Sequence, residues 1–225
     1  MVVPWDLDLT WESKFHIRSE SVWENWQNVF RFSSAERDFE NRAREVWDTI
    51  IESAWASAEP GLWFVDRSNQ MSNSWYYDRG DLICTNPCGE QPLPAWAVCN
   101  LGHVNLSRFV AKGKVNWDEL GHSVRTAVRF LDNVIDAPPY FFEQNAAQQK
   151  DERRVGMGTI GLAEMLIRLG IRYGSDESAA FIDKLYHFIA TEAYKASTGI
   201  AEEKGSFKLF DAVKFLQSDF ITEMP

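Results

Sequence analysis

The stretch from Asn86 to Pro94 constrains this chain more than any other, because it holds three prolines and one glycine within nine residues. Proline removes a backbone hydrogen-bond donor and glycine favours turns, so we expect a loop here. A carboxamide, a thiol and a carboxylate also lie at alternate positions, on Asn86, Cys88 and Glu90. In an extended segment alternate side chains share a face. We therefore expect these three groups to point the same way and to form a chemical site.

The composition is typical of a soluble globular protein, with 225 residues of which 45% are hydrophobic and 25% charged. A net charge of −10 argues against a nucleic-acid surface, because phosphate contacts need clustered Lys and Arg, although a small nucleotide can still bind locally. We find no signal peptide and no apolar run of about 18 residues, so we expect a cytoplasmic protein without a membrane span.

Periodic apolar residues predict helices, and short apolar runs predict strands between them. The predicted helices cover 35–58, 117–135, 159–169 and 175–205, and Asn116 and Ser175 are the expected N-caps of the second and the last. The predicted strands are Leu62–Val65, Leu82–Thr85 and a short one at Arg154–Gly158. This alternation favours an α/β fold with a parallel sheet. Apolar residues continue to both ends without a linker, so we expect part of a longer or split protein.

Three cysteines lie within sixteen positions, which in a chain without a secretion signal indicates thiol chemistry or metal ligation. One alternative is therefore a zinc-stabilised interaction module with the ligands Cys84, Cys88, Cys99 and His103. The first two cysteines lack the tight spacing usual in such sites, and the neighbouring carboxamide and carboxylate would have no role. We therefore predict no metal here.

Residues 156–161 match the pattern G-x-G-x-x-G and open a predicted helix, as in dinucleotide-binding folds. In those folds the preceding strand is apolar, whereas Lys150–Arg154 is charged. We therefore interpret these glycines as residues that let a helix pack closely after a strand.

The segments Thr85–Pro94 and Cys99–Leu106 resemble the active-site finger loop of ribonucleotide reductase large subunits, and are most similar to the adenosylcobalamin-dependent class. Three further segments resemble the family in the family's own order: Ala58–Arg67, Arg129–Asp136 and Arg154–Leu162. The resemblance covers residues 35–225, which we interpret as a partial catalytic barrel domain. Residues 1–34 form an unassigned lead-in.

The resemblance implies thiyl-radical chemistry. In the family a cysteine radical abstracts hydrogen from the ribose 3′ carbon, and Cys88 lies at that position. Glu90 is implied as the base for the 3′-hydroxyl, which eases loss of the 2′-hydroxyl as water, and Asn86 as the donor that orients the substrate hydroxyls. A pair of cysteines then supplies two electrons and ends as a disulfide. Cys99 matches one member of the pair, whereas Cys84 is expected to be a small core residue.

The resemblance also implies a fold, a ten-stranded α/β barrel with the finger loop inside, of which this chain would supply about half. It implies a ribonucleoside di- or triphosphate substrate and adenosylcobalamin as cofactor, with the diiron-partner class as the alternative. A dNTP effector would bind to regions outside the chain, and a thioredoxin- or glutaredoxin-like protein would be the reductant. Half a barrel exposes strand edges and apolar surface. We therefore expect it to be inactive without the rest of the reductase, which is a homodimer when complete.

Overall fold

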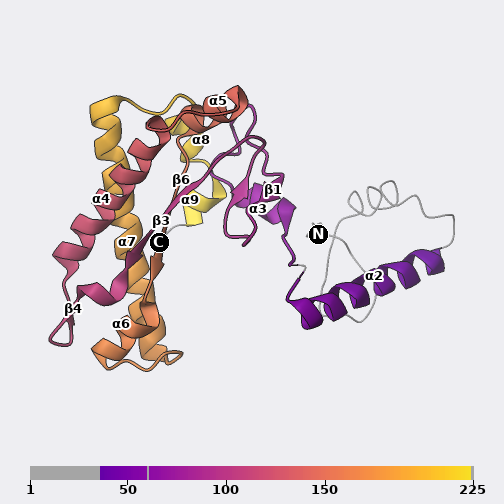
Figure 1. The fold of residues 1–225 in the computed structure, drawn as a ribbon, viewed down its shortest axis with the longest axis horizontal. Helices are drawn as coiled ribbons and strands as arrows, with labels where there is room; N and C mark the ends of the chain where they lie inside the picture. Colours follow the sequence, from indigo (N-terminus) through magenta and orange to yellow (C-terminus); the bar gives the residue numbers. More distant parts are fainter. Residues whose placement is uncertain (1–35, 60, 224–225) are drawn as a thin grey trace. The chain divides into compact units, whose positions relative to one another are not determined.

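We describe the chain from a computed structural model, which covers residues 36–59 and 61–223, with side chains from Arg42 onward (Figure 1). The predicted lead-in of residues 1–34 lies outside the described residues. The chain divides into two compact units. One runs to Ala95 and includes Gln217–Thr222, and the other is Trp96–Leu216 with the residues from Glu223.

The first unit is built from helices and one small hairpin. The predicted N-terminal helix is confirmed as α2, and β1 pairs with β2 in antiparallel fashion, with Cys84 opposite Leu93 and Thr85 opposite Pro92. Its elements are α2 (Glu36–Ser57), α3 (Val65–Met71), β1 (Cys84–Thr85), β2 (Pro92–Leu93) and α9 (Asp219–Glu223).

The strand predicted at Leu62–Val65 is wrong, because Val65 begins α3. A run of four apolar residues does not distinguish a strand from the start of a helix. Here Asp66 in the first turn favours a helix N-terminus, and the indole Nε1 of Trp63 donates to Ser68 Oγ at 2.7 Å. Leu62 is exposed, so the run is not a buried strand.

The second unit contains a parallel pair of strands, as the sequence predicts. β3 pairs with β6 in register from Asn100 opposite Val155 to Asn105 opposite Ile160. The short β4 and β5 form a separate antiparallel hairpin. The elements up to α5 are β3 (Asn100–Asn105), η1 (Leu106–Phe109), β4 (Val110–Ala111), β5 (Lys114–Val115), α4 (Trp117–Asp136) and α5 (Glu143–Glu152). The remaining elements are β6 (Val155–Ile160), α6 (Leu162–Leu169), α7 (Asp176–Lys204) and α8 (Ala212–Phe215).

The helix α4 organises the core of this unit, because it packs against both α7 and β3 (Figure 1). Its N-cap is the predicted one, with Asn116 Oδ1 accepting from Glu119 N at 3.2 Å. One face of α4 is buried, as its apolar spacing predicts. The buried core cluster consists of Val104, Leu106, Phe109, Leu120, Val124, Met165, Leu185 and Ile189.

The boundaries of α7 agree with the prediction, whereas α6 begins at Leu162 and not at Thr159, because β6 continues to Ile160 and Gly161 caps the helix. Ser175 Oγ accepts from Ser178 N at 3.2 Å at the start of α7, and Gly205 follows its last residue. In contrast, α5 has no counterpart in the sequence analysis, because its residues are mostly polar and lack an apolar period. Gln148, Gln149 and Glu152 are buried in it.

The architecture is a mixture of helices and small sheets. The described residues form three two-stranded sheets and no closed barrel, so the expected α/β class holds while the barrel itself is not formed by these residues alone. None of the helices in the described ranges is both long and apolar enough to cross a membrane.

Candidate active site

The predicted site loop is a tight hairpin turn between β1 and β2. Gly89 N donates to the Asn86 carbonyl at 3.0 Å, which closes a turn with Pro87 and Cys88 at its two central positions. Gly89 has φ of +82°, a conformation that glycine adopts without strain. Below the turn, Ile83 N donates to the Leu93 carbonyl at 3.0 Å. The prolines and the glycine thus form the predicted loop.

The side chain of Asn86 closes the wider part of this loop. Its Oδ1 accepts from Gln91 N at 3.0 Å, and its own backbone N donates to the Gln91 carbonyl at 3.3 Å. The expectation that Asn86, Cys88 and Glu90 alternate along an extended segment is therefore wrong. Pro87 and Gly89 turn the backbone between them, so the three groups share a turn and not a strand face.

The thiol and the carboxylate of this turn are both accessible to solvent. Cys88 and Glu90 are exposed, and Asn86 is half-buried. Cys84 is exposed as well, which corrects the expectation of a small core residue, and its Sγ donates to the Leu93 carbonyl at 3.7 Å. β1 and β2 are each only two residues long, so the strand that carries Cys84 is too short to bury its side chains.

Asn69 of α3 anchors the chain that leads into the hairpin. Its Oδ1 accepts from Leu82 N at 2.8 Å, and its Nδ2 donates to the carbonyls of Leu82 at 3.0 Å and Val65 at 3.2 Å. Leu82 itself is buried. Sequence reasoning missed Asn69, because a single carboxamide on a short polar helix carries no spacing signal.

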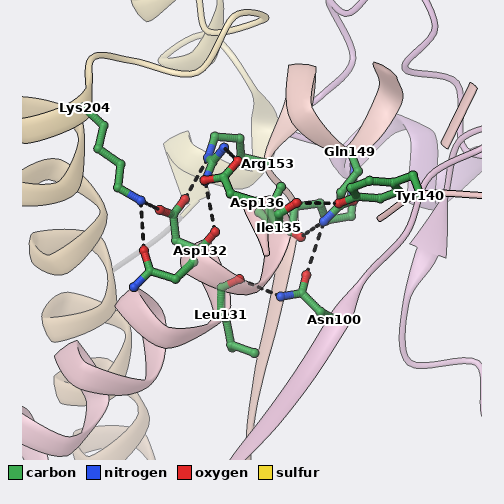
Figure 2. A network of polar contacts seen from close by, with 11 residues as sticks. Asn100, Leu131, Asp132, Ile135, Asp136, Tyr140, Gln149, Arg153 and Lys204 are labelled. Carbon is green, nitrogen blue, oxygen red and sulfur yellow. Dashed lines mark hydrogen bonds and ion pairs between the residues drawn. The ribbon is translucent and has the colours of Figure 1, made fainter. Parts of the chain in front are cut away.

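Cys99, the other predicted thiol, lies in the second unit. It is half-buried and directly precedes Asn100, the first residue of β3. Figure 2 shows the polar network that surrounds Asn100 at the C-terminal end of α4. Cys99 therefore belongs to a different unit from the Cys88 turn.

An ion-pair cluster lies at the centre of this network. Arg153 Nε donates to Asp132 Oδ1 at 2.8 Å and its Nη2 donates to Asp136 Oδ2 at 2.8 Å, while Lys204 Nζ donates to Asp132 Oδ2 at 2.7 Å (Figure 2). Burial opposes the ionisation of Asp132, but the hydrogen bonds from Arg153 and Lys204 outweigh it, so its pKa is lowered. The hydrogen bonds from Arg153, opposed by burial, also lower the pKa of Asp136.

No three His, Cys, Asp or Glu side chains of the described part are grouped so as to hold a metal ion. Close contacts with neighbouring side chains explain why glycine occupies positions 158 and 161. A Cβ on Gly158 would meet the His103 ring at 2.8 Å, and Gly161, with φ of +76°, precedes α6 where a Cβ would lie 2.5 Å from Asn105 Oδ1. They allow close packing of strand and helix, as the sequence predicts.

An open hollow of about 380 Å³ lies on the second unit, along α4. Its lining residues are His122, Arg125, Thr126, Arg129, Phe130 and Asn133. Two of its arginines are already paired with α7, Arg125 with Glu192 and Arg129 with Glu203. The hollow contains neither of the predicted catalytic thiols.

Comparison with known proteins agrees with the resemblance seen in the sequence. The family model for the ribonucleotide reductase barrel domain matches residues 15–224, and so begins inside the stretch of 1–34 that the sequence left unassigned. The vitamin B12-dependent ribonucleoside-diphosphate reductase of Thermoplasma acidophilum is 46% identical over 170 residues, which are 74% of this chain and 22% of that protein.

Two further relatives extend the comparison. The vitamin B12-dependent ribonucleoside-diphosphate reductase of Mycobacterium tuberculosis is 42% identical over 176 residues, 78% of this chain and 25% of that protein. The ribonucleoside-diphosphate reductase large subunit of Vaccinia virus is 30% identical over 198 residues, 85% of this chain and 25% of that protein. The chain thus spans about a quarter of the length of these relatives. Because the family model matches most of its length, the chain belongs to the ribonucleotide reductase family, as part of the barrel domain.

Proposed function

We propose that this chain carries the radical-bearing thiol of a ribonucleotide reductase. The observation that carries the proposal is the position of Cys88 at the exposed tip of a turn closed by Asn86 and Gly89, with Glu90 two residues further along. A group that attacks a bound sugar must be exposed on a backbone that is itself fixed. The turn meets both conditions for the Cys88 sulfur.

In the proposed reaction, the Cys88 thiyl radical takes the hydrogen atom from the ribose 3′ carbon. The C–H bond breaks, an S–H bond forms and the radical moves to the sugar. Glu90 accepts the proton of the 3′-hydroxyl, which assists loss of the 2′-hydroxyl as water. After the 2′ carbon is reduced, the hydrogen returns from Cys88 to the 3′ carbon, so the thiyl radical is regenerated.

Asn86 is proposed to hold the substrate hydroxyls through its amide nitrogen. Its Oδ1 is occupied by Gln91 N. Within the described ranges Nδ2 has no acceptor, so that group is available to donate to a hydroxyl. The bond from Gln91 fixes the orientation of the carboxamide, which leaves its donor side in one place. The loop therefore binds Oδ1 of Asn86, and the substrate would bind Nδ2.

Two electrons are needed to replace the 2′-hydroxyl by hydrogen. We propose that Cys99 and a second thiol from outside this chain supply them. The C2′–O bond breaks, a C2′–H bond forms and the two sulfurs join, so the balance is one ribonucleotide and two thiols to one deoxyribonucleotide, water and a disulfide. A thioredoxin- or glutaredoxin-like dithiol then reduces the disulfide by thiol exchange.

Adenosylcobalamin is the proposed cofactor, because the Thermoplasma and Mycobacterium relatives are named vitamin B12-dependent. When bound, it would supply the radical that oxidises the Cys88 thiol. The hollow on α4 is open and lined by charged and polar side chains, which does not fit a corrin ring. No residue of the described part of this chain is therefore assigned to the cofactor.

The assembled enzyme is proposed to be a cytoplasmic homodimer whose ten-stranded barrel is completed by regions outside this chain. Other regions would bind the dNTP effector. The names of the relatives favour a ribonucleoside diphosphate as substrate. The two-stranded sheets with unpaired edges support the need for further strands.

The test is deoxyribonucleotide formation by the assembled reductase carrying Cys88→Ser, with zinc content measured in parallel. We expect no detectable product, because a serine O–H bond is too strong to replace the thiol. Cys84→Ser is the matched control, since Cys84 is also exposed in the same hairpin, and it should leave turnover unchanged. Full turnover by Cys88→Ser, or one tightly held zinc per chain that is lost with His103→Ala, would overturn the proposal.

A further inference from the structure

The side chain of Asn100 connects the residue after Cys99 to two helices. Its Nδ2 donates to the Leu131 carbonyl of α4 at 2.6 Å, and its Oδ1 accepts from Gln149 Nε2 of α5 at 3.2 Å (Figure 2). Gln149 Nε2 also donates to the Arg154 carbonyl at 2.8 Å, at the entrance to β6. One carboxamide thus ties the start of β3 to α4, α5 and the start of its partner strand.

The groups that hold Asn100 are themselves fixed. Gln149 is only 1% exposed. The carbonyl of Leu131 directly precedes Asp132, which is held by Arg153 and by Lys204 of α7. These contacts leave the end of α4 little freedom to move relative to its neighbours.

A second contact joins β3 to the same residue of α4. A Cβ on Gly102 would lie 3.4 Å from Leu131 Cδ2, so the strand backbone lies close to that side chain. Asn100 and Gly102 are two residues apart and share the strand face that meets α4. Asn100 donates a hydrogen bond to the Leu131 carbonyl, and Gly102 leaves room for the Leu131 side chain. Both contacts fix the position of β3 on α4.

Cys99 itself lies just outside this arrangement. The paired residues of β3 begin at Asn100, so Cys99 is not within the ladder with β6. Its backbone is anchored through its neighbour. A thiol that alternates between S–H and disulfide must stay within reach of its reaction partners. A displacement of the thiol by about 1 Å lowers the rate of its reaction on the order of 100-fold.

We propose that Asn100 is a positioning residue for the reducing thiol: through Leu131 and Gln149 it fixes the backbone from which Cys99 reacts. This inference rests on the proposed function, in which Cys99 supplies electrons to the substrate. Asn100 touches no reacting atom in this account and acts only through Cys99. Its loss should therefore slow reduction without slowing hydrogen abstraction by Cys88.

The test compares these two steps in the assembled reductase carrying Asn100→Asp. This change keeps the shape and one hydrogen bond, but replaces the donor to the Leu131 carbonyl by an acceptor. Tritium that exchanges from the Cys88 thiol into water before it returns to the sugar reports abstraction from a 3′-tritiated ribonucleotide, and deoxyribonucleotide formation reports reduction. Within the first turnover, before regeneration of the thiyl radical limits both steps, we expect the rate of reduction to fall on the order of 10- to 100-fold and the rate of tritium release to stay at the wild-type value.

A second variant tests the same contact in case Asn100→Asp folds poorly. In the described part of the chain Gln149 Oε1 has no hydrogen-bond partner, so Gln149→Met removes only the two donated bonds. It should shift the ratio of the two rates in the same direction. Asn105→Ala is the matched control, because it removes an asparagine from the other end of β3, where Asn105 Oδ1 accepts from Ser107 N. It should leave the ratio unchanged.

The outcomes separate the inference from the proposed function. An equal fall of both rates in Asn100→Asp and Gln149→Met, or no fall in either, would overturn the positioning role. Cys99→Ser tests the underlying assumption and should abolish reduction. Full reduction by Cys99→Ser would remove Cys99 from the reaction, whereas loss with Cys99→Ser and no effect at Asn100 would reject the positioning role alone.

Discussion

The imidazole of His103 lies over Gly158, the residue opposite it on the parallel strand β6. A Cβ on Gly158 would be 2.8 Å from Cδ2 and 2.9 Å from Nε2 of the ring, closer than such atoms approach in proteins. The middle glycine of the G-x-G-x-x-G pattern thus lies where any larger side chain would meet this ring. This contact gives the pattern a packing role that needs no bound dinucleotide.

A methyl group at Gly158 should therefore destabilise the chain. We expect Gly158→Ala to lower the free energy of unfolding by about 1–3 kcal/mol, because the ring or the strand must shift. Denaturant unfolding of the assembled reductase measures this. The double variant Gly158→Ala/His103→Ala should recover most of the loss, and a loss that persists without the ring would show that another contact is responsible.

The buried face of α4 gives a second prediction. Leu120 is 0% exposed in the core cluster. Leu120→Ala should lower the free energy of unfolding by about 2–5 kcal/mol, since a cavity remains. Thr126→Ala, at an exposed position of the same helix, should change it by less than about 0.5 kcal/mol. Equal losses of stability in the two variants would contradict the burial of Leu120 and the exposure of Thr126 on α4.

The carboxylate of Asp132 predicts a dependence of stability on pH. Its pKa is lower in the folded chain than in the unfolded one, so its ion pairs stabilise the fold at neutral pH. That contribution is complete above the unfolded pKa of about 4 and is lost as the pH falls through the folded value. Asp132→Asn should therefore be less stable than the wild type at pH 7, and the difference should shrink toward pH 3. A difference that stays constant over this range in denaturant unfolding would contradict the assignment.

Much of the second unit could be predicted because its signals are local. Asn116 and Ser175 cap α4 and α7 through contacts three residues away, and their periods fix the buried faces. Local signals also give a wrong prediction at one helix and none at another. Leu62–Val65 is apolar enough for a strand but begins a helix, and the polar α5 carries no period at all.

The candidate site divides in the same way. A motif predicts Cys88 and Glu90, and Pro87 and Gly89 predict the loop, but the tight turn that they form replaces the extended alternation expected for the side chains. Asn100 and Gln149 could not be assigned, because their hydrogen bond joins residues 49 positions apart and carboxamides have no characteristic spacing. Long-range polar contacts of this kind become visible only once the backbone is folded.

The central claim is that the Cys88 sulfur takes the hydrogen atom from the substrate, and tritium release from a 3′-tritiated ribonucleotide measures this step directly. In the assembled reductase, the wild type and Cys84→Ser should release tritium at the same rate, and Cys99→Ser should still release it. Cys88→Ser should release none. Tritium release by Cys88→Ser at the wild-type rate would contradict the account.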